Sequence, residues 1–181
     1  MNRSLIRILA ALAVLSMSGC ASLSKSECMN ANWQDIGIRD GANGQPEEYL
    51  IQHSTACAKV HVTPDRARWL AGREQGLERF CTPARAYQIG EYGGGFEPGI
   101  CRNFDPERLF DAYQKGREVN RLAGALGSID NEIRDIHTQL EKKDLDGKER
   151  ERLAYRLGQL EYERNEAQHA YDEAHYRARN L

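Results

Sequence analysis

Two series of apolar residues with heptad spacing constrain this chain more than any other feature of its sequence. The first series steps alternately by four and three residues and consists of Leu122, Leu126, Ile129, Ile133, Ile136 and Leu140. The second has the same alternation and consists of Leu153, Leu157, Leu160, Arg164, Ala167, Tyr171 and Ala174. Residues at this spacing lie along one side of a helix, so each series predicts a long helix with a seam for a partner helix.

The two predicted helices fit each other as an antiparallel hairpin. Facing positions of such a pair have a constant sum of residue numbers, and three successive pairs, beginning with Leu140 and Leu153, satisfy this condition. The centre of that register falls within Asp144-Leu145-Asp146-Gly147, a turn-forming segment in which Gly147 is expected to end the first helix. Arg164 interrupts the second series, and its stem is expected to lie along Ile129 with the charged group in water.

The cysteines are the second constraint. Four of the five lie beyond the N-terminal segment, at Cys28, Cys57, Cys81 and Cys101. An even number in an exported chain predicts two disulfides. Three connectivities are open, and we favour Cys28–Cys57 with Cys81–Cys101 because sequential pairing closes the shortest loops. The alternative is a four-cysteine zinc site, but the C-x-x-C spacing typical of such sites is absent from the sequence, so we expect no metal and no cofactor.

These constraints predict a mainly α chain in two parts. A small disulfide-stapled head of short helices and loops is expected at 27–104, followed by a long, coiled-coil-like antiparallel helical hairpin at 105–181. Trp69–Glu74 in the head resembles Tyr113–Glu118 near the start of the hairpin, and each segment follows a proline-containing helix start. We expect these two helices to pack their aromatic and glycine faces together; the alternative is a ligand site between them.

The first twenty residues have the pattern of an export signal. Arg3 and Arg7 supply positive charge, and Ile8–Leu15 is a short apolar run. The stretch Met17-Ser18-Gly19-Cys20 resembles a bacterial lipobox. We therefore expect residues 1–19 to be a signal peptide and Cys20 to carry acyl chains such as palmitate. The alternative is an ordinary secretory signal followed by a chance cysteine.

The residues after Cys20 bear on location. In the lipoproteins that this segment resembles, aspartate after the cysteine favours retention in the inner membrane, whereas this chain has Ala21. The resemblance therefore implies the outer membrane, with the protein facing the periplasm. Two or more acyl chains suffice for stable anchoring, so the membrane is an expected partner through Cys20. Residues 20–26 are small and polar and are expected to be a lipidated tether.

An ordered set of cysteines, aromatic residues and glycines carries a family resemblance over about residues 20–118. The set consists of Cys28, Trp33, Gly37, Asp40, Gly41, Cys57, Trp69, Gly72, Cys81, Thr82, Pro83, Gly90, Cys101, Tyr113 and Gly116. In this order it resembles a family of small bacterial outer-membrane lipoproteins known only as a domain of unknown function. The resemblance implies an envelope lipoprotein and supplies no activity and no catalytic residues.

Charge and motifs exclude several function classes. With 25 basic and 27 acidic residues, the chain lacks the basic excess that a nucleic-acid partner requires. The nucleophile elbow, the zinc-protease motif and the P-loop are absent from the sequence. We therefore expect a non-enzymatic adaptor or structural protein whose hairpin binds an envelope protein or associates with a second copy.

Two sets of aromatic residues are candidate binding surfaces. Off the seam of the second helix, an aromatic residue or histidine recurs every seven residues, at Tyr155, Tyr162, His169 and Tyr176. This set either covers the edge of the seam or forms a stripe for a partner. In the head, the candidates for stacking on a glycan or another small ligand are Trp33, Trp69, Tyr87 and Tyr92. A periplasmic ligand-binding module is therefore the alternative function, and a core role for the tryptophans is the alternative to ligand binding.

Overall fold

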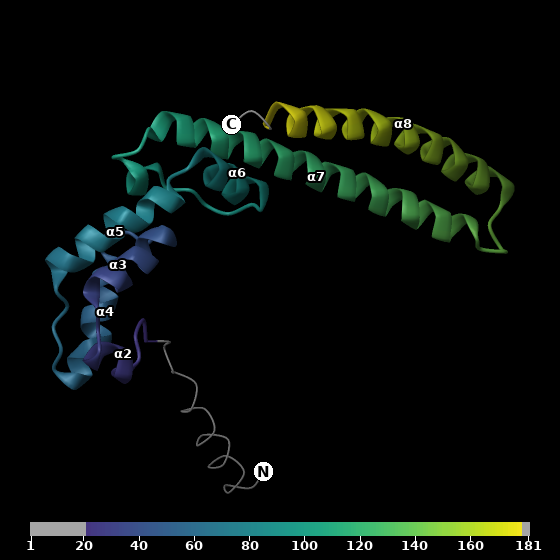
Figure 1. Cartoon of the computed structure of the whole chain (residues 1–181). Coiled ribbons are helices and arrows are strands. Elements are labelled where there is room, and N and C mark those ends of the chain that lie inside the picture. The colour runs from purple at the N-terminus through teal and green to yellow at the C-terminus, as the bar shows by residue number, and fades with distance from the viewer. Residues whose placement is uncertain (1–20, 179–181) are drawn as a thin grey trace, which may run out of the picture. The chain divides into compact units, whose positions relative to one another are not determined.

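The computed structural model of the chain describes residues 21–178, and every regular element in that range is helical (Figure 1). In chain order the α-helices are α2 (Lys25–Met29), α3 (Trp33–Ala42), α4 (Tyr49–Cys57), α5 (Arg66–Phe80), α6 (Pro83–Glu91), α7 (Pro106–Leu140) and α8 (Gly147–Ala178). Two short 3-10 helices span Ala58–Val60 and Pro98–Cys101. The mainly α fold class is therefore confirmed. The expected signal peptide at 1–19 and the expected lipidation site Cys20 lie outside the described residues.

The helices form two compact units. Unit 1 comprises the described residues up to Gly41 together with Gln45–Gly76, and unit 2 comprises Ala42–Gly44 and the residues from Leu77 onward. We expected a boundary between a head at 27–104 and a hairpin at 105–181, whereas α6 and the second disulfide belong to the same unit as the hairpin. The difference arises because α6 packs along α7, the first helix of the hairpin.

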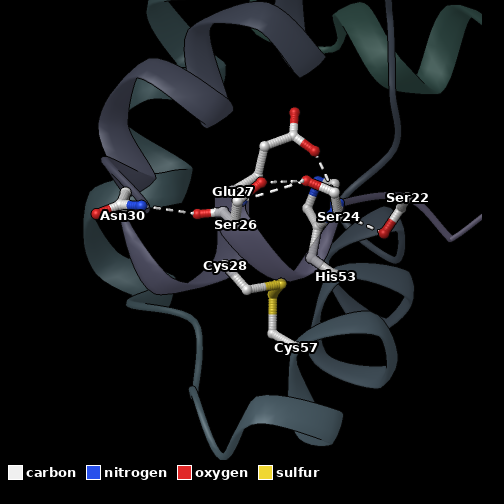
Figure 2. Close-up of a disulfide and its surroundings, with 8 residues drawn as sticks. All are labelled: Ser22, Ser24, Ser26, Glu27, Cys28, Asn30, His53 and Cys57. Atoms are coloured by element: carbon white, nitrogen blue, oxygen red, sulfur yellow. Dashed lines mark hydrogen bonds between the residues drawn. A yellow bond between two sulfur atoms is a disulfide. The ribbon is translucent and has the colours of Figure 1, made fainter.

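Unit 1 is built around the first disulfide and the two tryptophans. Cys28 at the end of α2 bonds to Cys57 at the end of α4 (Figure 2). The buried core comprises Leu23, Cys28, Trp33, Ile36, Cys57 and Trp69. Both predicted disulfides are confirmed, since Cys81 is paired with Cys101 in unit 2.

Unit 2 combines an aromatic core with the long hairpin. The core lies around the Cys81–Cys101 disulfide, where the ring of Phe96 lies 6.3 Å from that of Phe80 and 5.6 Å from that of Tyr113. Thr82 caps α6 by accepting a hydrogen bond from the Arg85 N–H at 3.2 Å. Helix α7 begins in the same way, with Asp105 as its cap and a proline in its first turn.

The hairpin follows the predicted seam. Helices α7 and α8 run side by side, joined by a turn at one end (Figure 1). Buried at their interface are Ile136, Leu153 and Leu160, with Ile129, Ile133, Leu140, Leu145 and Leu157 packed against them. With 35 residues, α7 is about 52 Å long at 1.5 Å per residue. Arg164 directs its guanidinium outward as expected, and its Nε donates to Asp130 Oδ1 at 2.6 Å.

One detail of the turn differs from the prediction. Gly147 does not end the first helix; α7 ends at Leu140, and Gly147 is the first residue of α8. Asp146 is the reason, because its carboxylate accepts a hydrogen bond from the Glu149 N–H at 2.9 Å and so caps the second helix. The charged group of Arg150 then closes the turn by donating to the Leu140 carbonyl at 2.9 Å.

Both units contain a close helix crossing made by two glycines. In unit 1, a Cβ added to Gly37 on α3 would overlap the Trp69 carbonyl, and one added to Gly72 on α5 would overlap the Gln34 carbonyl. The expectation that the aromatic and glycine faces of α5 and α7 pack together is therefore wrong. Gly72 instead meets the α3 backbone within its own unit.

Unit 2 repeats this geometry with different residues. Gly90 on α6 meets the Tyr113 carbonyl of α7, and Gly116 on α7 meets the Tyr87 carbonyl of α6. In both units, each of the two glycines therefore packs against the residue that lies three positions before the other glycine. Each unit therefore combines one disulfide with one glycine crossing.

Candidate functional sites: a buried polar network and an exposed tyrosine stripe

Three helices of unit 1 bring together a buried aspartate, histidine and tryptophan. Asp40 on α3 accepts two hydrogen bonds through Oδ2, one from His53 on α4 at 2.7 Å and one from the Trp69 indole N–H on α5 at 2.8 Å. Asp40, His53 and Trp69 are 4 %, 1 % and 0 % exposed, respectively. A buried carboxylate is tolerated only when such donors satisfy it, so this network ties the three helices to one arrangement.

The N-terminal segment completes this network. The hydroxyl of Ser22 lies 2.8 Å from His53 Nδ1, the ring nitrogen that Asp40 leaves free (Figure 2). If the imidazole carries its proton on Nε2, it donates to Asp40 and accepts from Ser22, so both ring nitrogens are paired. The next residue, Leu23, is 3 % exposed and belongs to the core.

The following residues form a capping box. Ser24 caps α2 by accepting a hydrogen bond from the Glu27 N–H at 3.3 Å, and its own N–H donates to Glu27 Oε2 at 2.7 Å (Figure 2). That second bond holds the pKa of the Glu27 carboxyl below its ordinary value. The described part of the expected lipidated tether at 20–26 is thus an ordered segment that leads into α2, since small polar residues are also what helix caps require.

Ser22, His53 and Asp40 are the residue types of an acyl-transfer triad. In such enzymes the histidine takes the serine proton while the nucleophile faces a substrate. Here the imidazole is enclosed by Asp40, Ser22 and the ring of Tyr49, whose centroid is 5.0 Å away. His53 is 1 % exposed, and its hydrogen bond to Ser22 holds the N-terminal segment on unit 1.

The aromatic residues predicted to bind a ligand divide between the two units. Trp33 and Trp69 are 8 % and 0 % exposed and belong to the core of unit 1, in agreement with the alternative interpretation. Tyr87 and Tyr92 lie in unit 2, on α6 and at its C-terminal end. Tyr92 is 82 % exposed, whereas Tyr87 is half-buried.

Tyr87 belongs instead to a polar cluster that joins α6 to the end of α8. Its hydroxyl donates to Glu91 at 3.1 Å, and His175 of α8 places Nε2 3.5 Å from the same carboxylate. His175 Nε2 also lies 2.9 Å from the Tyr171 hydroxyl. Burial, assisted by the bond to Glu91, raises the pKa of Tyr87 to about 12. The C-terminal half of the hairpin is therefore tied to α6.

The predicted tyrosine stripe on α8 is exposed. Tyr155, Tyr162 and Tyr176 are 71 %, 68 % and 67 % exposed, and His169 is also on the surface. They do not cover the seam, since side chains in that role would be partly buried. Between Tyr155 and Tyr162, the absence of a side chain at Gly158 leaves a shallow groove whose other walls are Ala154, Gln159 and Glu163.

Among residues 21–178, no cluster of three or more histidine, cysteine or acidic side chains has a geometry for a metal ion. None of the helices in this range is both long enough and apolar enough to cross a membrane.

Residues 32–118 match the model of a family described as a protein of unknown function, DUF2799. The expected resemblance to a domain of unknown function is thereby confirmed for this range. The DUF2799 segment contains both glycine crossings and the buried Asp40–His53–Trp69 network, and it ends within α7, before the seam of the hairpin. Neither the curated proteins nor the solved structures include a match to this chain.

Sequence reasoning missed the buried network, although two spacings point to it. His53 precedes Cys57 by one helical turn and therefore lies on the side of α4 that carries the disulfide. Asp40 follows Gly37 by three residues and so faces the same way as the crossing glycine. The recurrence of a cysteine and a crossing glycine was also visible, because Cys28 and Cys81 precede Gly37 and Gly90 by the same number of residues.

Proposed function

We propose that this chain is a lipid-anchored lipoprotein of the cell envelope that acts as a non-enzymatic adaptor. The lipobox-like sequence ending at Cys20 supports the anchor, and Ala21 supports the periplasmic face of the outer membrane as its location. Two disulfides fit an oxidising compartment. In this proposal the acyl chains on Cys20 hold the protein at the membrane, and the hairpin binds a protein partner.

The tyrosine stripe is the observation that carries the adaptor role. Three tyrosines more than two-thirds exposed on one helix are an unusual use of large aromatic side chains, which gain most when a partner covers them. Gly158 lowers the surface between two of them, so a side chain of the partner can enter the groove. The partner is an envelope protein or a second copy of this chain.

Photo-crosslinking in intact cells tests this role. A photoreactive amino acid at Gln159, within the groove, is expected to give a discrete crosslinked product that disappears in the Tyr155→Ala/Tyr162→Ala variant. The same amino acid at Gln114, an exposed position of α7, is the matched control and is expected to give no such product. A product of twice the chain's mass would identify self-association.

The anchor has its own test. Cys20→Ser is expected to abolish labelling by a radioactive fatty acid and to release the protein from membranes. Labelling of this variant at the level of the natural chain would contradict the anchor. A Gln159 product that is unchanged by the two alanine substitutions would contradict the adaptor surface.

A further inference from the structure

The place at which the chain enters unit 1 bears on how an anchored protein would meet its membrane. Ser22 is fixed by its hydrogen bond to the buried His53, Leu23 is part of the core, and Ser24 caps α2. The described chain is therefore fixed to unit 1 from Ser22 onward, and Figure 2 shows Ser22 beside His53. We call the Ser22–His53–Asp40 hydrogen-bond chain the latch.

The distance from the latch to the expected anchor is short. Ala21 is the one residue between Ser22 and Cys20. Two Cα–Cα steps of an extended chain span at most about 7 Å. Acyl chains on Cys20 therefore have to enter the bilayer within that distance of the surface of unit 1, so unit 1 has no room to move away from the lipid headgroups.

We propose that unit 1 docks directly on the phospholipid surface, with the latch fixing the face that it presents. This inference rests on the acylation of Cys20 proposed above. The occupant of this face is the lipid headgroup layer, because an acylated Cys20 lies only two positions before Ser22 and so brings that layer next to unit 1. A flexible tether would allow unit 1 many orientations, whereas the latch and the core position of Leu23 allow a narrow range.

The chain carries its own probe of this docking. Its two tryptophans, Trp33 and Trp69, both lie in unit 1. The acylated protein, purified from membranes, would be placed in vesicles of phosphatidylethanolamine and phosphatidylglycerol that contain a dansyl-labelled headgroup. Energy transfer from tryptophan to dansyl then reports the distance of unit 1 from the lipid surface.

A linker insertion separates docking from simple anchoring. Ten Gly/Ser residues between Ala21 and Ser22 add a mean reach of about 17 Å. We expect this variant to remain bound to vesicles and to lose at least half of the energy transfer. The matched control carries the same ten residues after Asp144, in the turn of the hairpin, and is expected to transfer energy as the natural chain does.

The outcomes distinguish this inference from the anchor itself. If the natural chain floats with vesicles and its energy transfer is unchanged by the linker, the short link to Cys20 does not hold unit 1 on the lipid surface, and this inference is wrong while the anchor stands. If the natural chain carries no acyl group and does not float, the proposed anchor is wrong, and the docking inference is overturned with it. Reduced transfer in the linker variant alone supports docking.

Discussion

Gly116 shows how a single hydrogen atom can determine a helix crossing. A Cβ at this position would overlap the Tyr87 carbonyl of α6, which is backbone and cannot swing away. Gly116→Ala is therefore expected to separate α6 from α7 and to destabilise unit 2 by about 1–3 kcal/mol, the usual cost of overpacking. Denaturant unfolding followed by circular dichroism measures this loss.

Gly124 provides a matched control on the same helix. A Cβ at Gly124 has no heavy atom within 4 Å. Gly124→Ala should be neutral or stabilise the protein by up to about 1 kcal/mol, since alanine is the better helix former. Equal effects of the two substitutions would mean that the crossing is not close-packed.

Ser22 is the residue on which the latch depends. Ser22→Ala removes the hydroxyl from a buried ring nitrogen, so we expect a loss of about 1 kcal/mol and faster hydrogen exchange of the amides of residues 23–28. Ser54→Ala, at an exposed position next to His53 on α4, is the control. Unchanged exchange in the Ser22 variant would show that Leu23 alone holds the segment.

The hydroxyl of Tyr87 provides a prediction about pH. Its pKa is raised from 10.0 to about 12, first by burial and then by the hydrogen bond to Glu91. A raised pKa means that the folded state favours the protonated phenol, so this contribution to stability is present below pH 10 and is lost as the pH rises towards 12. In an ultraviolet titration of the folded protein, the natural chain should show one tyrosine that ionises at higher pH than the others, and Tyr87→Phe should lack it. Glu91→Gln should lower the pKa of this phenol, because it weakens the second cause. If Glu91→Gln titrated identically to the natural chain, the hydrogen bond to Glu91 would not contribute to the raised pKa.

At the scale of single elements, Leu160 is the strongest test of the hairpin. It is 1 % exposed in the seam between α7 and α8. Leu160→Ala is expected to destabilise unit 2 by about 2–5 kcal/mol, because it leaves a cavity that neighbouring side chains fill only in part. Gln159→Ala, at the adjacent exposed position, should have little effect. A small loss for Leu160→Ala would mean that the seam is not tightly packed.

The hairpin was predictable because its information is periodic and local. Each seam residue lies three or four positions from the next, so the pattern of apolar residues alone reports both the helices and their register. Gly147 was misplaced because Asp146 and Gly147 are adjacent, and the same pair of residue types can end one helix or begin the next. Signals of this kind identify a turn more reliably than they identify its boundaries.

The buried network and the latch could not be predicted in the same way. Asp40, His53 and Trp69 come from three helices and meet through tertiary packing, which leaves no periodic trace in the sequence. Ser22 and Ser24 are small and polar, and composition does not distinguish a tether from a capped helix start. The packing of α6 on α7, across the expected boundary at 104, was not predicted for a related reason, because it depends on two glycines that local propensity disfavours in helices.

At the scale of the whole molecule, two units with separate cores and separate disulfides have separate sources of stability. The natural probes also divide between them. Tryptophan fluorescence reports unit 1, which holds both tryptophans. Far-ultraviolet circular dichroism reports mainly unit 2, which contains the two longest helices, α7 and α8.

Two substitutions, one in each unit, should therefore separate the two signals. Cys28→Ser/Cys57→Ser returns loop entropy to unfolded unit 1 and should destabilise it by about 3–4 kcal/mol, moving the fluorescence transition to lower denaturant. Leu160→Ala should move the circular dichroism transition and leave the fluorescence transition nearly in place. If each variant instead shifted both transitions equally, the chain would unfold as one cooperative body, and α5, which passes from one unit to the other, would be the element that couples them.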